Sequence, residues 1–255
     1  MTSEQTILCM KKEVGETPLE CLSRYRKDNP AFADVPMTYA GRLDPMASGL
    51  LLVLAGKITE SYKKKLLSFD KTYEFEVLWG FGSDTGDVLG IAEKTGEKPI
   101  YHFDMKLPKL ISDIEKIKTQ EYPAYSSKPV DGTPLFAHAR AGTLQDIEIP
   151  TRQVKIFSLE HIHTKEVSEK DVLQIIEERI GKVHGDFRQE QILTRWREVL
   201  PGADTVLISK IRATVSSGTY IRSLAQLMGK KLGCGGLACS IHRTRVGPYI
   251  LQNAE

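Results

Sequence analysis

The sequence predicts an α+β fold in which a mixed, mainly antiparallel central sheet is flanked by helices. Strand-like and helix-like segments follow one another without the regular alternation that produces a doubly wound parallel sheet. The 255 residues contain no internal repeat and no low-complexity tract. Hydrophobic residues make up 41% and charged residues 27%, which is typical of a globular protein with a sizeable core.

Composition also limits the functional classes. The four cysteines form no CxxC pair, which favours free thiols in a reducing cytoplasm over a disulfide framework. The longest apolar run, at residues 50–55, is too short to span a membrane, and the N-terminal residues lack the pattern of a signal peptide. A formal net charge of +2 permits nucleic-acid binding without demonstrating it, because clustering of charge matters more than its total.

The first elements follow from apolar patterns and caps. Residues 17–28 predict a helix with an apolar stripe, and a loop rich in Pro and Asp follows. The continuous apolar run at residues 50–54 predicts a short buried strand. Thr59 is a candidate cap for a helix over residues 60–69.

The middle of the chain alternates between strand, loop and helix signals. Residues 71–80 predict a half-buried strand whose inward face carries Tyr73, Phe75, Val77 and Trp79. A turn-rich loop follows, and residues 107–119 predict a helix. Residues 121–150 contain Pro, Gly and Ser with scattered basic residues, so we expect an extended and partly mobile excursion there.

The last third predicts three helices and two strands. Ser168 is a candidate N-cap for a helix over residues 168–180, and a second amphipathic helix is expected over residues 186–200. Residues 205–215 are typical of a strand. A helix then begins after Thr219 and ends at Gly229 or Gly233, before a final strand at residues 240–250.

Asp44 is the first candidate for chemistry. It lies between Leu43 and Pro45, directly before the apolar run, where a partly desolvated carboxylate needs a cationic partner or donated hydrogen bonds. Arg42 is two residues away. The alternative is that Asp44 only begins a turn before Pro45, and local sequence alone favours that alternative.

Two further segments pair an aromatic with a cation. In "SSGTYIRSL" a strand ends at a Gly turn and a helix opens with Tyr220 and Arg222, which can aim Arg222 at an anion. Lys71 precedes Tyr73, and this pair could hold a phosphate and stack on a base. The alternatives are a solvated Arg or Lys and a core Tyr, and local sequence favours them.

Arg243 and Arg245 alternate on the final strand, which suits a groove that binds a nucleic-acid backbone as well as it suits a solvated face. The histidines and cysteines lack the spacing of a zinc site, and no phosphate-binding loop or dinucleotide fingerprint is present.

Five segments in order carry a family resemblance: "GRLDPMASGLLLVLAGKIT", "DKTYEFEVLWGFGSDTGDVLG", "YPAYSSKPVDGTPLFAHARAG", "SSGTYIRSLAQLMGKKLGCGG" and "IHRTRVGPY". Together they resemble the TruB family of tRNA pseudouridine synthases, over about residues 7–158 and 206–249. The resemblance implies the pseudouridine synthase fold and the isomerisation of a T-loop uridine, at the conventional tRNA position 55, without cofactor or metal. The partner would be the T-arm stem-loop of tRNA, and the target base would be flipped out first.

The resemblance also implies roles for single residues. Asp44 matches the essential aspartate, acting as a nucleophile or as a proton acceptor, and Arg222 would pair with it. Tyr73 would stack on the flipped uracil. Residues 122–150 match a mobile RNA-gripping loop, the thumb, in which Lys128 and Arg140 are candidate phosphate contacts. The other expected substrate or RNA contacts are Tyr39, Arg42, Lys71, Tyr220, Ile241, Arg243 and Arg245.

The sequence departs from the family pattern in four places. Tyr39 stands where a His is usual, and "KKEVGETP" is an altered lysine-proline-glycine-threonine segment. Residues 160–205 form an expected helical insertion, and the chain stops soon after "RVGPYI", which leaves no room for a C-terminal PUA domain. We therefore expect a single catalytic domain over residues 1–255, acting as a monomer. An RNA chaperone without chemistry, and a synthase acting on another RNA, are the alternatives.

Overall fold

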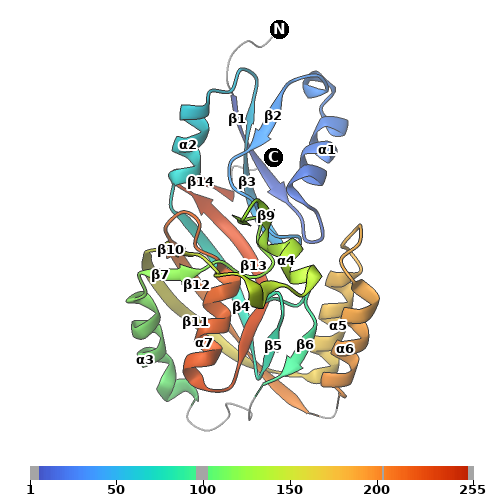
Figure 1. The fold of residues 1–255 in the computed structure, drawn as a ribbon, viewed down its shortest axis with the longest axis vertical. Coiled ribbons are helices and arrows are strands. Elements are labelled where there is room, and N and C mark those ends of the chain that lie inside the picture. Colours follow the sequence, from blue (N-terminus) through green and yellow to red (C-terminus); the bar gives the residue numbers. More distant parts are fainter. Residues whose placement is uncertain (1–5, 96–102, 203, 252–255) are drawn as a thin grey trace.

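A computed structural model describes residues 6–95, 103–202 and 204–251. Its centre is an eight-stranded sheet in the order β1-β3-β13-β4-β12-β11, with β14 beside β13 and β2 beside β3 (Figure 1). Only β13 and β3 pair in parallel within the described sheet. The predicted α+β fold with a mainly antiparallel sheet is therefore confirmed. The strands are β1 (Thr6–Lys12), β2 (Met37–Tyr39), β3 (Ala47–Ala55), β4 (Lys71–Trp79), β11 (Ile156–Ser168), β12 (Thr205–Val215), β13 (Gly236–Val246) and β14 (Tyr249–Ile250).

Helices and small two-stranded sheets surround this sheet (Figure 1). The α-helices are α1 (Pro18–Asp28), α2 (Glu60–Ser68), α3 (Phe103–Glu115), α4 (Leu135–Ala141), α5 (Glu169–Ile180), α6 (Gln189–Val199) and α7 (Ile221–Leu232). The small sheets pair β5 (Phe81–Ser83) with β6 (Ala92–Lys94), β7 (Thr119–Glu121) with β10 (Thr151–Gln153), and β8 (Pro129–Val130) with β9 (Thr133–Pro134). None of the helices in these ranges is long and apolar enough to cross a membrane.

Strand β3 is buried on both faces, which explains its continuous apolar sequence. Leu52 packs in one cluster with Leu66 of α2, whereas Leu51 packs in another with Leu22 of α1. Helix α1 begins where the sequence predicts, because Thr17 and Glu20 form a reciprocal capping box. Thr59 occupies the N-cap position of α2, but its side chain makes no capping hydrogen bond, so that expectation is only half correct.

Strand β4 presents the predicted apolar face to α3 and α7. Tyr73, Phe75, Val77 and Trp79 belong to one buried cluster with residues of both helices. On the opposite face, Leu78 belongs to a second cluster that includes Ile176 of α5 and Trp196 of α6. The sheet is thus sandwiched at β4, and its α7 side faces the site described below.

Two expectations about irregular segments are corrected. Residues 160–205 are not helical throughout, because residues 156–168 form β11, which pairs along β12, and helix begins only at Glu169. β11 is the edge strand of the sheet, so pairing with β12 satisfies one edge of its backbone, and most of its side chains are exposed or half-buried. The thumb, residues 122–150, is not simply extended: it holds the β8–β9 hairpin and α4, which is anchored by the fully buried Leu135.

The remaining predicted helices and strands are present. Ser168 caps α5 by accepting a hydrogen bond from the backbone of Asp171. Helix α7 ends at Gly233 in a left-handed conformation, whereas Gly229 lies inside the helix. At Gly229 a Cβ atom would lie 2.1 Å from the backbone nitrogen of Gly236, so α7 approaches β13 as closely as backbone permits.

Candidate active site

Asp44 begins a tight turn that leads directly into β3. Its carbonyl accepts a hydrogen bond from the backbone of Ala47 at 3.0 Å, with Pro45 at the second position of the turn. Its side chain remains 39% exposed and lines a cavity. The turn interpretation is therefore confirmed, and the same turn presents the carboxylate to the cavity.

Buried Lys12 holds this turn from behind. Its Nζ atom donates to the carbonyls of Ala47 at 2.6 Å, Glu13 at 2.9 Å and Pro45 at 3.5 Å. Burial lowers the pKa of Lys12 to about 8. Lys12 belongs to the altered "KKEVGETP" segment, which therefore retains a structural lysine beside the candidate aspartate.

Arg222 connects Asp44 to a second carboxylate, that of Asp87. Its Nε atom lies 2.7 Å from Oδ2 of Asp44 and 3.6 Å from Oδ2 of Asp87. Its two terminal nitrogens donate to the carbonyls of Thr85 and Tyr125. Burial alone would lower the pKa of Arg222, but the two carboxylates hold it above its ordinary value. The predicted pairing of Arg222 with Asp44 is present.

Asp87 is 4% exposed and lies in the loop that the sequence marks only as turn-rich. Its Oδ1 atom accepts from the hydroxyl of Thr85 at 2.7 Å and from the backbone of Leu89 at 3.0 Å. Burial raises the pKa of Asp87 to about 6, although Arg222 opposes this shift. Sequence reasoning missed this residue, because an Asp in a Gly-rich loop is usually a surface turn residue.

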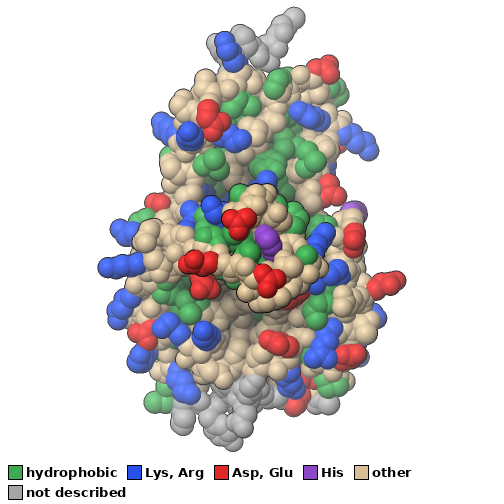
Figure 2. All heavy atoms as spheres, viewed as in Figure 1, with side chains coloured by type: hydrophobic (Ala, Val, Ile, Leu, Met, Phe, Trp, Pro, Cys, Tyr) green, Lys and Arg blue, Asp and Glu red, His purple; other side chains and the backbone are tan. Residues whose placement is uncertain are grey.

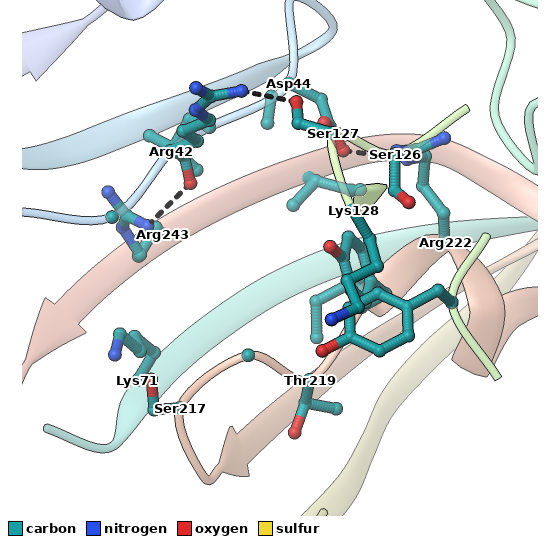
Figure 3. Close-up of a pocket in the computed structure, with 18 of the residues that line it drawn as sticks. Arg42, Asp44, Lys71, Ser126, Ser127, Lys128, Ser217, Thr219, Arg222 and Arg243 are labelled. Atoms are coloured by element: carbon teal, nitrogen blue, oxygen red, sulfur yellow. Dashed lines mark hydrogen bonds and ion pairs between the residues drawn. The ribbon is translucent and has the colours of Figure 1, made fainter. Parts of the chain in front are cut away.

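A cavity of about 490 Å³ opens beside Asp44 (Figure 3). In Figure 3, Arg222 lies at one end of it, and Lys71 and Arg243 lie at the other. Nine of the predicted site residues line this cavity: Arg42, Asp44, Lys71, Tyr73, Lys128, Tyr220, Arg222, Ile241 and Arg243. Segments far apart in sequence thus converge on the candidate aspartate.

The floor of the cavity is aromatic and apolar. Tyr73 of β4 and Ile241 of β13 are 8% and 6% exposed and provide flat apolar surface. Tyr220 lies at the start of α7, and its ring meets that of Tyr122 edge to face at 5.9 Å. The side chain of Gln120 fixes Tyr220 by exchanging hydrogen bonds with its backbone N–H and carbonyl. Such a surface suits a planar base.

Cationic side chains close the opposite end. Lys71 is 5% exposed, donates to the carbonyls of Leu67 and Phe69, and has a pKa lowered by burial to about 8. Arg243 is 1% exposed and donates to the carbonyls of Leu50 and Arg42. Its second terminal nitrogen, Nη2, is buried without a hydrogen-bond partner among the described residues. Two cations thus line this end of the cavity, which suits an anionic ligand.

Arg152 adds a cation that sequence reasoning missed. It donates to the carbonyl of Ser217 at 3.1 Å and lies 5.6 Å from the ring centre of Tyr122. Gly218 lies beside it with φ of 78°, a conformation that favours Gly, and a Cβ atom there would displace the Arg152 guanidinium. The contact joins β10 to the loop before α7, and residues 65 positions apart in sequence give no local sign of it.

Three predicted contacts lie elsewhere. Tyr39 pairs with Val53 in the β2–β3 register and packs on the α1 side of the sheet, away from the cavity. Arg245 donates to Thr72 and to the carbonyl of Gly247 and does not line the cavity, so the two arginines of β13 do not form one groove. Arg140 lines a second cavity instead. Among the described residues, no group of three or more His, Cys, Asp or Glu side chains could hold a metal ion.

Residues 33–181 match the family model described as TruB family pseudouridylate synthase (N terminal domain). The chain belongs to the TruB family. It is 33% identical over 216 residues to tRNA pseudouridine synthase B of Aromatoleum aromaticum, covering 85% of this chain and 56% of that relative. It is 29% identical over 250 residues to the protein of the same name from Bordetella avium, covering 97% of this chain and 83% of the relative.

The chain thus spans little more than half of the Aromatoleum TruB relative. Its fold is similar to that of solved structures. A chain from the crystal structure of a Cbf5-Nop10-Gar1 complex superimposes with a TM-score of 0.56 at 20% identity, covering 96% of this chain and 49% of that one. A chain from the archaeal box H/ACA sRNP Nop10-Cbf5 complex gives a TM-score of 0.52 at 18% identity, covering 96% and 48%. The resemblance to the TruB family seen in the sequence is confirmed.

Proposed function

We propose that this TruB family member is a tRNA pseudouridine synthase that isomerises a T-loop uridine at the conventional position 55. The names of the curated relatives support the activity and the tRNA substrate. The observation that carries the proposal is the ion pair between Arg222 and Asp44, at 2.7 Å, on the wall of a cavity with an aromatic floor. The T-loop target comes from the motifs that resemble the family.

The reaction is an isomerisation, so the nucleotide neither gains nor loses atoms overall. The N1–C1′ bond of the uridine breaks, the uracil rotates, C5 bonds to C1′, and the proton lost from C5 is balanced by one gained at N1. Asp44 would act on the nucleotide as a nucleophile or as a proton acceptor, and Arg222 would keep the carboxylate ionised and oriented. Both roles require an ionised carboxylate that faces the reacting nucleotide.

The cavity accounts for how the base would be held. The target base must leave its stack before any group of the protein can reach it. Tyr73 would stack on the flipped uracil, and Ile241 would pack against it. Arg243 and Lys71, which line the other end of the cavity, would supply positive charge near the sugar and phosphate.

The thumb would grip the RNA. It contacts the site directly, because Arg42 donates to the hydroxyl of Ser127 and Arg222 donates to the carbonyl of Tyr125. Lys128 lines the cavity and would meet the RNA backbone. Lys and Arg side chains flank the face that carries α4 (Figure 2), so RNA binding should weaken with salt as phosphate contacts release counterions.

The test is tritium release from transcribed tRNA labelled at C5 of uridine. We expect release by the wild-type protein, and release reduced at least about thousandfold by Asp44→Asn, whose isosteric amide can neither attack nor accept a proton. Binding of the RNA and the unfolding midpoint should remain close to those of the wild type. Unchanged turnover in Asp44→Asn would remove Asp44 from the mechanism, and tight binding without release by the wild type would indicate an RNA chaperone.

A further inference from the structure

The ring of Tyr122 contacts two cationic side chains at the base of the thumb. Nζ of Lys128 and the guanidinium carbon of Arg152 each lie 5.6 Å from the centre of this ring. All three residues line the cavity that contains Asp44, and in Figure 3 the side chain of Lys128 reaches into it. Lys128 belongs to the thumb, whereas Arg152 belongs to β10, which follows the thumb. None of the roles proposed above involves Tyr122.

Tyr122 is held in place where the two ends of the thumb meet. Its backbone N–H donates to the carbonyl of Pro150 at 3.1 Å, directly beside the β7–β10 pair of Glu121 with Thr151. Its ring meets that of Tyr220 edge to face at 5.9 Å, which is a favoured arrangement of two aromatic rings. The small β7–β10 sheet thus fixes the backbone of Tyr122, and the start of α7 sets the orientation of its ring.

The two cations differ in how they are restrained. Arg152 donates to the carbonyl of Ser217, whereas the ammonium of Lys128 forms no ion pair or hydrogen bond with another described residue. The contact with the ring of Tyr122 is therefore what restrains this ammonium. Two neighbouring cations repel each other, and the electron-rich face of an aromatic ring offsets that repulsion. A side chain that is already confined loses less freedom when a phosphate binds, so confinement raises affinity.

We propose that Tyr122 is a positioning residue whose ring holds Lys128 and Arg152 in place for the RNA backbone. The inference deepens the proposed function and rests on it, because Lys128 is the thumb residue proposed above to meet that backbone. Backbone phosphates are anions, and two cations held beside each other suit such a group. Tyr122 acts on RNA affinity through these two cations.

The test is a set of substitution cycles in which dissociation constants are measured by fluorescence anisotropy with a T-arm stem-loop RNA. The parent protein carries Asp44→Asn, so that bound RNA stays unreacted. Tyr122→Leu removes the aromatic ring, and Tyr122→Phe retains it. Lys128→Met and Arg152→Met keep the aliphatic stems of the two cations and remove their charges. The unfolding midpoint of every variant is measured beside its affinity.

We expect Tyr122→Leu to weaken RNA binding about fivefold, because two cationic side chains lose their restraint. Tyr122→Phe should bind RNA within about twofold of the parent, since a phenyl ring still attracts cations. In protein that carries both methionine substitutions, Tyr122→Leu should change the dissociation constant less than about 1.5-fold. If Arg152→Met lowers the unfolding midpoint, the cycle with Lys128→Met alone should still show a coupling of at least about twofold.

A loss of about fivefold that persists after both charges are removed would overturn the proposal, because Tyr122 would then contact the RNA or shape the cavity itself. Equal losses in Tyr122→Phe and Tyr122→Leu would overturn it too, since the aromatic ring would not be the group that matters. The same holds if Tyr122→Leu binds RNA as tightly as the parent.

Phe157→Leu is the matched control. Nζ of Lys155 lies 4.9 Å from the centre of the exposed ring of Phe157, and neither residue lines the cavity. RNA affinity should stay within about twofold in this variant, and a loss equal to that of Tyr122→Leu would contradict the assignment.

Tritium release by the protein with an intact Asp44 is measured separately. Release without any effect of Tyr122→Leu on affinity would overturn the role of Tyr122 alone. Affinity that depends on Tyr122 without release would contradict the proposed activity alone.

Discussion

The Nη1 atom of Arg188 lies 2.8 Å from Oδ2 of Asp84, the same carboxylate oxygen that accepts the hydroxyl of Tyr125 at 3.0 Å. The turn between α5 and α6 is thereby tied to the thumb and to the loop that carries Asp87. Because the carbonyl of Tyr125 accepts from Arg222, this link reaches the candidate catalytic pair through one residue.

Arg188→Ala should loosen the thumb. The pair is only partly exposed, so its loss should cost about 1 kcal/mol of local stability and speed amide exchange of Leu135 and Phe136 about fivefold. Hydrogen exchange followed by mass spectrometry of the thumb measures this. Arg197→Ala, which breaks an exposed pair with Glu177 on the same two helices, is the control and should leave thumb exchange unchanged. Equal exchange in the wild type and Arg188→Ala would contradict the link.

Arg222→Lys should separate positioning from charge. A lysine keeps the positive charge but cannot reproduce the planar set of donors that reaches Asp44, Thr85 and Tyr125. Misplacement of the carboxylate should lower kcat about a hundredfold. Single-turnover tritium release should show the lowered rate of the chemical step. Fluorescence anisotropy should show that the affinity for RNA changes by less than about threefold. A variant with wild-type kcat would show that orientation by Arg222 is unnecessary.

The raised pKa of Asp87 predicts a pH dependence of stability. Between about pH 4 and 6 the folded protein keeps a proton that the unfolded chain has released, because burial raises the folded pKa to about 6. The contribution of Asp87 to stability is therefore present at low pH and falls as pH rises through this window. Asp87→Asn should gain stability relative to the wild type across the same window, measured by urea unfolding at each pH. If the free energy of unfolding of Asp87→Asn differed from that of the wild type by the same amount at every pH, the raised pKa of Asp87 would be refuted.

The same titration should appear in activity. Above about pH 6 the Asp87 carboxylate is ionised and helps hold Arg222 against Asp44. We expect kcat/KM to fall below pH 6, and this limb should be absent in Asp87→Asn, whose activity is lower than that of the wild type above pH 6 and approaches it below pH 6. A pH profile of tritium release measures both. Retention of the full acidic limb in Asp87→Asn would assign it to another group.

Gly49→Ala should destabilise the fold at the contact between β3 and β13, beside the site. Gly49 has φ of 106°, and a Cβ atom there would lie 2.3 Å from the carbonyl oxygen of Arg243, across the parallel β3–β13 pair. The clash and the strained backbone should cost more than about 2 kcal/mol. Gly142→Ala, also with positive φ but with open space around its Cβ position, should cost only about 1 kcal/mol. Equal unfolding midpoints for the two variants would contradict the steric argument.

The fold was predictable where local rules and tertiary packing agree. The capping residues Thr17 and Ser168 mark helix starts, and alternation over residues 71–79 marks β4, because each signal is short-range. Strand β11 escaped prediction, since two bulges and a largely solvated, charged surface obscure its period.

The site was predictable through motifs and not through local physics. The pairing of Asp44 with Arg222 follows from the family resemblance, because nothing near residue 44 reveals a partner 178 positions away. Tyr39 does not line the cavity, because the β2–β3 register, a tertiary property, turns it toward α1. Asp87 was missed because its burial cannot be seen in a turn-rich segment, and Arg152 was missed because its contacts with Ser217 and Tyr122 are tertiary.

The position of β13 in the sheet has a consequence for biosynthesis. β13 lies between β3 and β4, although it follows every other long strand of the described sheet in sequence. A nascent chain that emerges from the ribosome in order holds two separate half-sheets, each with an open inner edge, until this strand arrives. Its insertion closes both edges at once and brings Ile241 and Arg243 to the cavity. The residues that β13 contributes to the cavity are therefore in place only after this strand has paired, and until then the two open inner edges are the part of the sheet that we expect to pair wrongly with other chains.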